Sequence, residues 1–141
     1  MIKKHILITG GGTGIGLVLA KRFAAKGWQV IIVGRRSELL QDVVSQNPDS
    51  IRAITADVGK YEDRPIITFQ VQEPLHLLVH NAAVLGPFGP LLKVGLEDWR
   101  SHIESNVEGP LFLTRELLPK LVEGSRVIQT SSGAAHQGKK A

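Results

Sequence analysis

The stretch Thr9-Gly10-Gly11-Gly12-Thr13-Gly14-Ile15-Gly16 decides the fold. It follows a short apolar run rich in β-branched residues, 5–9, which predicts a buried strand. A helical pattern follows at once over 14–26, with Gly27 as the expected C-terminal stop. A glycine-rich loop between a strand and a helix is typical of a site for a phosphate group, since the first amides of the helix point at the ligand.

The glycines of this loop have separate roles. Gly10 permits a tight turn, Gly14 lets the backbone approach a diphosphate without a Cβ, and Gly16 lets the helix pack close to the strand. The strict Gly-x-Gly-x-x-Gly spacing is not met, so a merely flexible turn is the alternative; the flanking strand and helix favour dinucleotide binding. Leu17 stands where a triphosphatase loop needs Lys after the last glycine, which disfavours ATP hydrolysis.

The rest of the chain continues to alternate between the two kinds of element. In the first helix, Ile15, Leu19 and Phe23 lie four apart on one apolar face. Further strands are predicted at 29–33, 51–55, 75–80 and 126–130, and further helices at 37–46, 61–72 and 96–118. Ser37 is the expected N-cap of the second helix, and Pro65 either sits in the first turn of the third or breaks it. This order predicts an α/β fold, a doubly wound parallel sheet of Rossmann type with five strands.

Composition limits the function classes. The 141 residues are 43% hydrophobic and 21% charged, which fits one domain over 1–141. The net charge of +4 comes from scattered basic residues, so we expect no nucleic-acid partner. Cysteine is absent, and no apolar run approaches the roughly 20 residues of a membrane span. We expect a soluble, cytoplasmic protein without a membrane partner.

The end of the second strand selects between the two nicotinamide cofactors. An acidic residue there would bind the ribose hydroxyl and repel a 2′-phosphate. Val33-Gly34-Arg35-Arg36 instead offers two guanidinium groups, which hold a phosphate in bidentate fashion. The alternative is a pair of solvated arginines. The position favours NADP(H) over NAD(H).

The chain resembles the short-chain dehydrogenase/reductase family. Thr9-Gly10-x-x-x-Gly14-Ile15-Gly16 is similar to its cofactor motif, and Asp57-Val58 to the pair that contacts the adenine ring. Asn81-Ala82-Ala83 resembles its Asn-Asn-Ala-Gly motif, from which His80 and Ala83 depart. Singly, such residues could be turn, cap or surface residues; their order favours function. The expected cofactor-binding residues are Thr9, Gly10, Gly12, Thr13, Gly14, Ile15, Gly16, Arg35, Arg36, Asp57, Val58, Asn81, Ala82 and Ala83.

The resemblance also supplies candidate catalytic residues. Ser131-Ser132 resembles the region of the family's catalytic serine, and the register favours Ser132 over Ser131. The resemblance implies that the Ser132 hydroxyl orients a substrate carbonyl and stabilises the developing alkoxide. It implies that Asn106 holds a water molecule in a proton relay.

The family's proton donor is not among these residues. It is a tyrosine in a Tyr-x-x-x-Lys motif downstream of the serine, whereas the single tyrosine here is Tyr61. We therefore expect a domain that is incomplete at its C-terminus and a 141-residue chain that is inactive by itself. Leu111 and Leu118 would then be exposed, and the full-length protein would form a homodimer or homotetramer through such surfaces.

Two functions remain open. The first is an NADP(H)-dependent oxidoreductase that transfers hydride between nicotinamide and a carbonyl or secondary alcohol of a small substrate, apolar if the loop 84–90 contacts it. The alternative is a non-catalytic NADP(H)-binding module or inactive fragment. His76 and His80 are four apart, but they lie in an extended run without a third ligand, so no metal site is expected.

Overall fold

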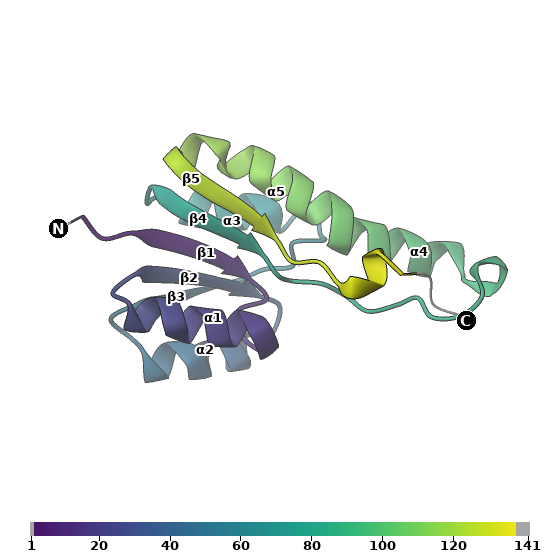
Figure 1. Ribbon diagram of the computed structural model, residues 1–141, viewed down its shortest axis with the longest axis horizontal. Helices are drawn as coiled ribbons and strands as arrows, with labels where there is room; N and C mark the ends of the chain where they lie inside the picture. The colour runs from purple at the N-terminus through teal and green to yellow at the C-terminus, as the bar shows by residue number, and fades with distance from the viewer. Residues whose placement is uncertain (1, 138–141) are drawn as a thin grey trace.

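The computed structural model describes residues 2–137 and contains a five-stranded parallel sheet in the order β3-β2-β1-β4-β5 (Figure 1). The strands are β1 (His5–Thr9), β2 (Gln29–Gly34), β3 (Ile51–Thr55), β4 (Leu75–His80) and β5 (Leu121–Gln129). The main helices are α1 (Gly14–Ala25), α2 (Ser37–Gln46), α3 (Arg64–Gln70), α4 (Leu96–Ile103) and α5 (Gly109–Leu117). The predicted doubly wound sheet is confirmed, and its strand order reverses between β1 and β4, where such sheets bind ligands.

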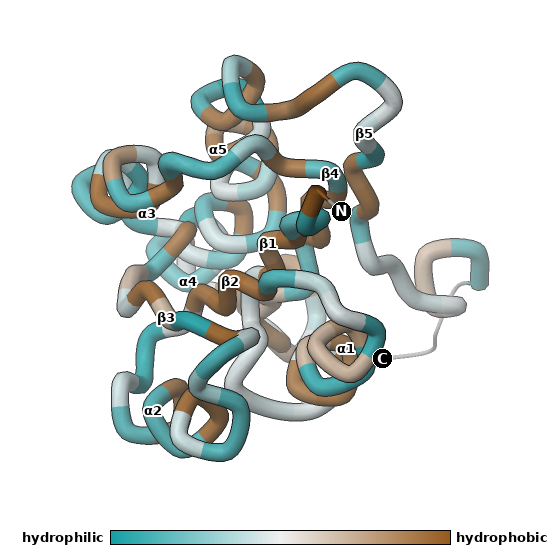
Figure 2. The backbone as a smooth tube through the Cα atoms, turned by 90° about the vertical axis from the view of Figure 1, so that its left-hand side faces the viewer, coloured by the Kyte–Doolittle hydropathy of each residue, from teal (hydrophilic) through white to brown (hydrophobic). Residues whose placement is uncertain are grey.

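Helices cover both faces of the sheet because successive strand residues point to opposite sides. Ile6 and Ile8 of β1 pack in a cluster with α1 and α2, whereas Leu7 packs in a second cluster with α3 and α5. Figure 2 shows the hydrophobic residues of β1 and β2 between these two helix layers. Ile6, Leu7 and Ile8 are fully buried, so the strand before the glycine loop is the centre of the core.

The contact between α1 and the sheet differs from the predicted face. Gly16, Ala20 and Ala24 are the buried residues of this helix, while Ile15 is 68% exposed. Leu19 and Phe23 only flank the core cluster. Small side chains let the helix axis approach the sheet closely, which a face of large residues would prevent.

Two helix starts also differ from the predictions. Arg36, not Ser37, is the N-cap residue of α2, and it makes no capping hydrogen bond through its side chain. The third helix is shorter than predicted: α3 covers only Arg64–Gln70. Pro65 lies in its first turn, where the missing N–H removes no helical hydrogen bond.

The predicted helix over 96–118 is interrupted. Between α4 and α5 lies a π-helical segment, η2 (Glu104–Glu108), in which the amide of Gly109 donates to the carbonyl of Glu104 five residues earlier. Pro110 explains the interruption, because it has no N–H for the carbonyl of Asn106 and its ring would clash with that carbonyl in a regular helix. The wider turn absorbs the proline without ending the helix.

The fifth strand begins earlier than the predicted 126–130. Leu121 already pairs with Leu75, and the register shifts before Arg126 pairs with Leu77. Gly124 lies in this irregular part with a φ of +79°, a conformation that favours glycine. Polar residues and a glycine at this shift hide the start of the strand from a pattern of apolar residues.

Candidate functional site

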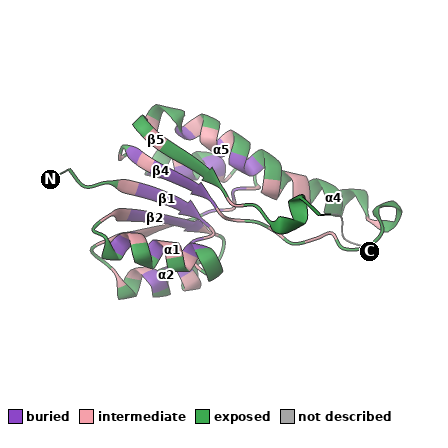
Figure 3. Cartoon of the chain, in the orientation of Figure 1, coloured by how far each residue is buried: buried purple, intermediate pink, exposed green. Residues whose placement is uncertain are grey.

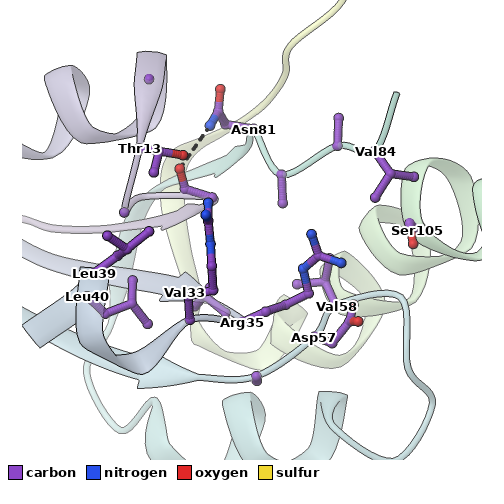
Figure 4. Close-up of a pocket in the computed structure, with 18 of the residues that line it drawn as sticks. Thr13, Val33, Arg35, Leu39, Leu40, Asp57, Val58, Asn81, Val84 and Ser105 are labelled. Atoms are coloured by element: carbon purple, nitrogen blue, oxygen red, sulfur yellow. Dashed lines mark hydrogen bonds between the residues drawn. The ribbon is translucent and has the colours of Figure 1, made fainter. Parts of the chain in front are cut away.

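A cavity of about 520 Å³ opens at the carboxyl ends of the strands, beside the point where the strand order reverses (Figure 4). Twelve of the fourteen predicted cofactor-binding residues line it: Gly10, Gly12, Thr13, Gly14, Ile15, Arg35, Arg36, Asp57, Val58, Asn81, Ala82 and Ala83. The structure thus brings together residues from four separate loops. Thr9 and Gly16 do not line the cavity but lie behind its wall.

Thr9 and Gly10 fix the glycine loop to both neighbouring strands. The buried hydroxyl of Thr9 accepts hydrogen bonds from the amides of Asn81 and Ala82, both at 3.0 Å. The amide of Gly10 donates to the carbonyl of Val33 at 2.7 Å, and its own carbonyl accepts from Asn81 Nδ2 at 3.3 Å (Figure 4). The cavity floor is therefore joined to β2 on one side and to the loop after β4 on the other.

Gly14 and Gly16 are needed for different reasons. A Cβ on Gly16 would overlap the carbonyl oxygen of Gly10, so this glycine permits the close approach of helix and loop. A Cβ on Gly14 would meet no atom within 4 Å, and its φ is +54°. The space beside Gly14 is on the cavity side, where a ligand can approach the backbone.

The start of α1 is free to receive an anion. Thr13 is the N-cap residue, its side chain makes no capping hydrogen bond, and the first turn contains no acidic residue. The first N–H groups of a helix have no partner within the helix, and the helix dipole adds positive potential there. This end of the cavity fits a diphosphate.

The other end of the cavity carries two cations and one carboxylate. Arg35 extends into the cavity toward Val58, as Figure 4 shows, and Arg36 also lines the wall. Among the described residues neither arginine forms an ion pair. Asp57 accepts a hydrogen bond from the amide of Gly59 at 2.9 Å, which holds the loop after β3 against the cavity. An anionic group between the arginines would find unpaired donors.

Asn106 lies in η2 and does not line the cavity. Its side chain holds both backbone groups of Val84: Oδ1 accepts from the amide and Nδ2 donates to the carbonyl, each at 2.9 Å. Val84 itself lines the cavity. The Asn106 side chain therefore positions the wall of the cavity.

The two serines after β5 stay outside the cavity. Both are exposed, and the Ser132 hydroxyl accepts a hydrogen bond from the amide of Ala134 at 3.2 Å. Thr130, just before them, donates through its amide and its hydroxyl to the carbonyl of His80, at 3.0 and 3.2 Å. The structure places the serine segment beside the end of β4 but not on the cavity wall.

His80 is buried where β4, β5 and α5 meet. Its Nε2 lies 2.6 Å from the hydroxyl of Thr114, which itself donates to the carbonyl of Pro110 at 2.8 Å. Since a hydroxyl has one proton, we assign the proton between His80 and Thr114 to Nε2 of the imidazole. Burial lowers the pKa of His80 to about 4, so the ring is neutral at neutral pH.

Sequence reasoning missed several residues of the wall. Leu39 and Leu40 of α2 line the cavity near the arginines, and Ser105 of η2 lines it opposite. The proline at 110 was the available signal for Ser105, because it predicts a break in the helix one turn earlier. No comparable signal marks the two leucines, since their pattern only indicates a buried helix face.

The segment after Val84 is strongly apolar and exposed. Leu85, which lines the cavity, Phe88 and Leu92 are each more than 80% exposed.

His76 lies at the other end of β4, where its Nδ1 accepts from the amide of His5. Within residues 2–137 no cluster of three potential metal ligands occurs, and no helix has the length and apolar character needed to cross a bilayer.

Comparisons with known proteins agree on one family. Residues 4–141 match the family model described as short chain dehydrogenase. The chain is 33% identical over 135 residues to serine 3-dehydrogenase of Agrobacterium fabrum, covering 93% of this chain and 54% of that protein. It is 32% identical over 124 residues to the NADP-dependent 3-hydroxy acid dehydrogenase YdfG of Salmonella typhi, covering 86% and 50%.

Solved structures give the same result. A short chain dehydrogenase from Burkholderia cenocepacia in complex with NADP superposes with a TM-score of 0.89 at 32% identity, covering 98% of this chain and 59% of the other. One from Streptomyces avermitilis gives 0.88 at 32% identity, covering 96% and 52%. The chain spans about half the length of the curated relatives that it matches. With its fold, its glycine loop and this match over nearly all its residues, the chain belongs to the short-chain dehydrogenase/reductase family.

Proposed function

We propose that this chain binds NADP(H) as the cofactor domain of an oxidoreductase. The observation that carries the choice of cofactor is the pair Arg35 and Arg36 on the cavity wall, without an acidic residue at the end of β2. A 2′-phosphate would provide the anion that these two guanidinium groups lack. NADP in the Burkholderia cenocepacia neighbour supports the same choice.

The residues present fit the dinucleotide along its length. The open space beside Gly14 and the uncapped start of α1 would hold the diphosphate, and Asp57 with Val58 would contact the adenine end. Asn81 to Ala83 would line the path toward the nicotinamide. When bound, the cofactor supplies or accepts the hydride.

For the reaction we propose hydride exchange with a carbonyl or secondary alcohol of a small substrate. Val84 and Leu85 on the cavity wall and the exposed apolar side chains beyond them support an apolar substrate surface. Ser132 is the proposed group that orients the substrate oxygen, with Asn106 in the proton relay. Tyr61, the single tyrosine, does not line the cavity, so we expect the 141-residue chain to bind NADP(H) without hydride transfer. The alternative is a purely binding role. It would be favoured if the full-length protein showed no turnover.

For the full-length protein we propose association through α5. Leu111 and Leu118 are exposed on this helix and on the segment that follows it, as the sequence predicts. Exposed apolar side chains of this kind mark surfaces between subunits. Sedimentation of the full-length protein and of a Leu111→Glu variant tests this: a monomeric wild type would contradict it.

The cofactor proposal is tested by Arg35→Asp combined with Arg36→Ala. Each charge-assisted hydrogen bond contributes roughly 1.5 to 3 kcal/mol, so the NADP+ dissociation constant should rise by roughly a hundredfold or more. The NAD+ dissociation constant should change little. The matched control is Lys21→Asp with Arg22→Ala, which makes the same charge change on the exposed side of α1. Equal losses for NADP+ and NAD+ in the first variant would contradict the assignment.

A further inference from the structure

Arg64 is a buried cation without a carboxylate partner. It is 5% exposed, and among the described residues it forms no ion pair. Its Nε is buried and has no hydrogen-bond partner in the part of the chain that the structure describes. The guanidinium lies over two aromatic rings, with Cζ 5.1 Å from the centre of Phe112 and 5.7 Å from that of Tyr61. Burying a charge in this way is costly, so the contacts that it does make require an explanation.

The polar contact of Arg64 is with the end of the π-helical segment. Nη1 donates to the carbonyl of Glu108 at 3.4 Å, and Glu108 is the last residue of η2. Phe112, which stacks on the same guanidinium, lies one turn later in α5. Arg64 thus contacts the helix on both sides of the junction between its π-helical and α-helical parts.

The same segment rests on the loop after β3. A Cβ on Gly59 would lie 2.6 Å from the hydroxyl of Ser105, and a Cβ on Gly109 would lie 2.7 Å from the carbonyl of Val58. The loop and η2 are therefore in direct contact through two glycines. Arg64 adds a link from the first turn of α3 to this contact.

Asn106 is held between these supports and the cavity. It lies inside η2, and its side chain closes two hydrogen bonds with the backbone of Val84. A π-helical turn directs side chains differently from a regular helix, so the state of η2 decides whether Asn106 reaches Val84. We call this pair of hydrogen bonds the Asn106–Val84 clamp.

We propose that Arg64 is a positioning residue, which holds η2 in its π-helical state and thereby keeps the Asn106–Val84 clamp closed on the cavity wall. Its importance for cofactor binding rests on the proposed function, but the clamp itself does not. The guanidinium donates to the carbonyl of Glu108 at the end of η2, so it supplies a donor where the hydrogen-bond pattern changes from π-helical to α-helical. The aromatic rings fix the orientation of the guanidinium.

The test compares Arg64→Met, Arg64→Lys and the control Arg52→Met by hydrogen exchange of the Val84 amide in the 141-residue chain without nucleotide. Arg52 also ties α3 to the sheet, through the carbonyl of Gln70 and an ion pair with Glu73, but it lies away from η2. We expect Arg64→Met to lower the protection of the Val84 amide about tenfold or more, with a parallel change in the side-chain amide signals of Asn106. Arg64→Lys keeps a cationic donor and should stay within about threefold of wild type, as should Arg52→Met.

Stability separates positioning from a simply structural role. Replacing a buried, unpaired charge by an apolar side chain is often neutral or stabilising, so the unfolding midpoint of Arg64→Met should be unchanged or higher while the clamp opens. Unchanged Val84 protection in Arg64→Met, or equal losses in Arg64→Lys and Arg52→Met, would overturn the proposal. Titration of the wild-type chain with NADP+ tests the proposed function separately. If it binds, Arg64→Met should raise the dissociation constant by roughly threefold to tenfold, as the fraction of closed clamp falls.

Discussion

The two halves of the carboxyl edge differ in how firmly they are held. On the glycine-loop side, residues 6–9 of β1 are buried, and its loop is hydrogen-bonded to the ends of both β2 and β4. On the serine side, Val127 and Ile128 of β5 are 45% exposed (Figure 3), and the Ser132 hydroxyl has only a local hydrogen bond among the residues that the structure describes. Under the proposed function, this difference makes binding and chemistry separable: the sheet itself builds the proposed cofactor cradle, whereas nothing in the described residues fixes the serine segment on the cavity.

Gly16→Ala should have the largest effect, because Gly16 lies in the firmly held, glycine-loop half of the carboxyl edge. The added Cβ would overlap the carbonyl of Gly10 and crowd Asn81 Nδ2, both parts of the loop framework. Overpacking against backbone costs about 3 kcal/mol, so we expect a loss of that size in the free energy of unfolding. NADP+ binding should be lost as well. Urea unfolding and fluorescence titration measure the two effects.

Gly14→Ala is the matched control within the same loop. Its Cβ meets no protein atom, so the folded state loses only about 1 kcal/mol through the positive φ. Binding should still weaken by roughly a hundredfold, because the methyl group would occupy the space for the diphosphate. A variant that binds NADP+ normally would place the diphosphate elsewhere and contradict the proposed cradle.

Acid should act on the junction between the two halves, at His80. The pKa of this histidine is about 4 in the fold and 6.5 in an unfolded chain, so the unfolded state binds more protons between these values. Through His80 alone, the free energy of unfolding should stay nearly constant above pH 6.5 and should fall by about 3 kcal/mol as the pH drops to 4. Burial also lowers the pKa of His5, which adds to the same trend.

His80→Asn isolates this effect. Asparagine does not titrate, and its amide can donate to the hydroxyl of Thr114, so unfolding midpoints at pH 7 and 4.5 should differ less than in wild type. His136→Asn, at an exposed position outside the junction, is the control and should keep the full pH dependence. If the unfolding midpoint of His80→Asn depends on pH as strongly as that of the wild type, groups other than His80 destabilise the protein in acid.

The firm half was also the predictable half. The bounds of β1 and β4 and the glycine loop were visible because they depend on apolar runs and on glycine, which are local features. The face of α1 was wrong because tertiary packing selected Ala20 and Ala24 over the larger side chains of the helix. The π-helical segment depends on Pro110 within a pattern that otherwise continues as a helix, and the Arg64 contact joins residues 44 positions apart. No local pattern reports such a contact.

Ser132→Ala should have the smallest effect, and it tests the less firmly held, serine half of the carboxyl edge. The residue is exposed and, within residues 2–137, its hydroxyl bonds only to Ala134, so the free energy of unfolding should change by less than about 0.5 kcal/mol. NADP+ affinity should stay within about twofold, because Ser132 does not line the cavity. Ser131→Ala, one residue closer to β5, is the control and should behave alike in binding. A selective loss of NADP+ affinity in Ser132→Ala would mean that the serine segment reaches the nicotinamide end in solution. The two halves would then already be coupled in this chain, and the separation of binding from chemistry would fail.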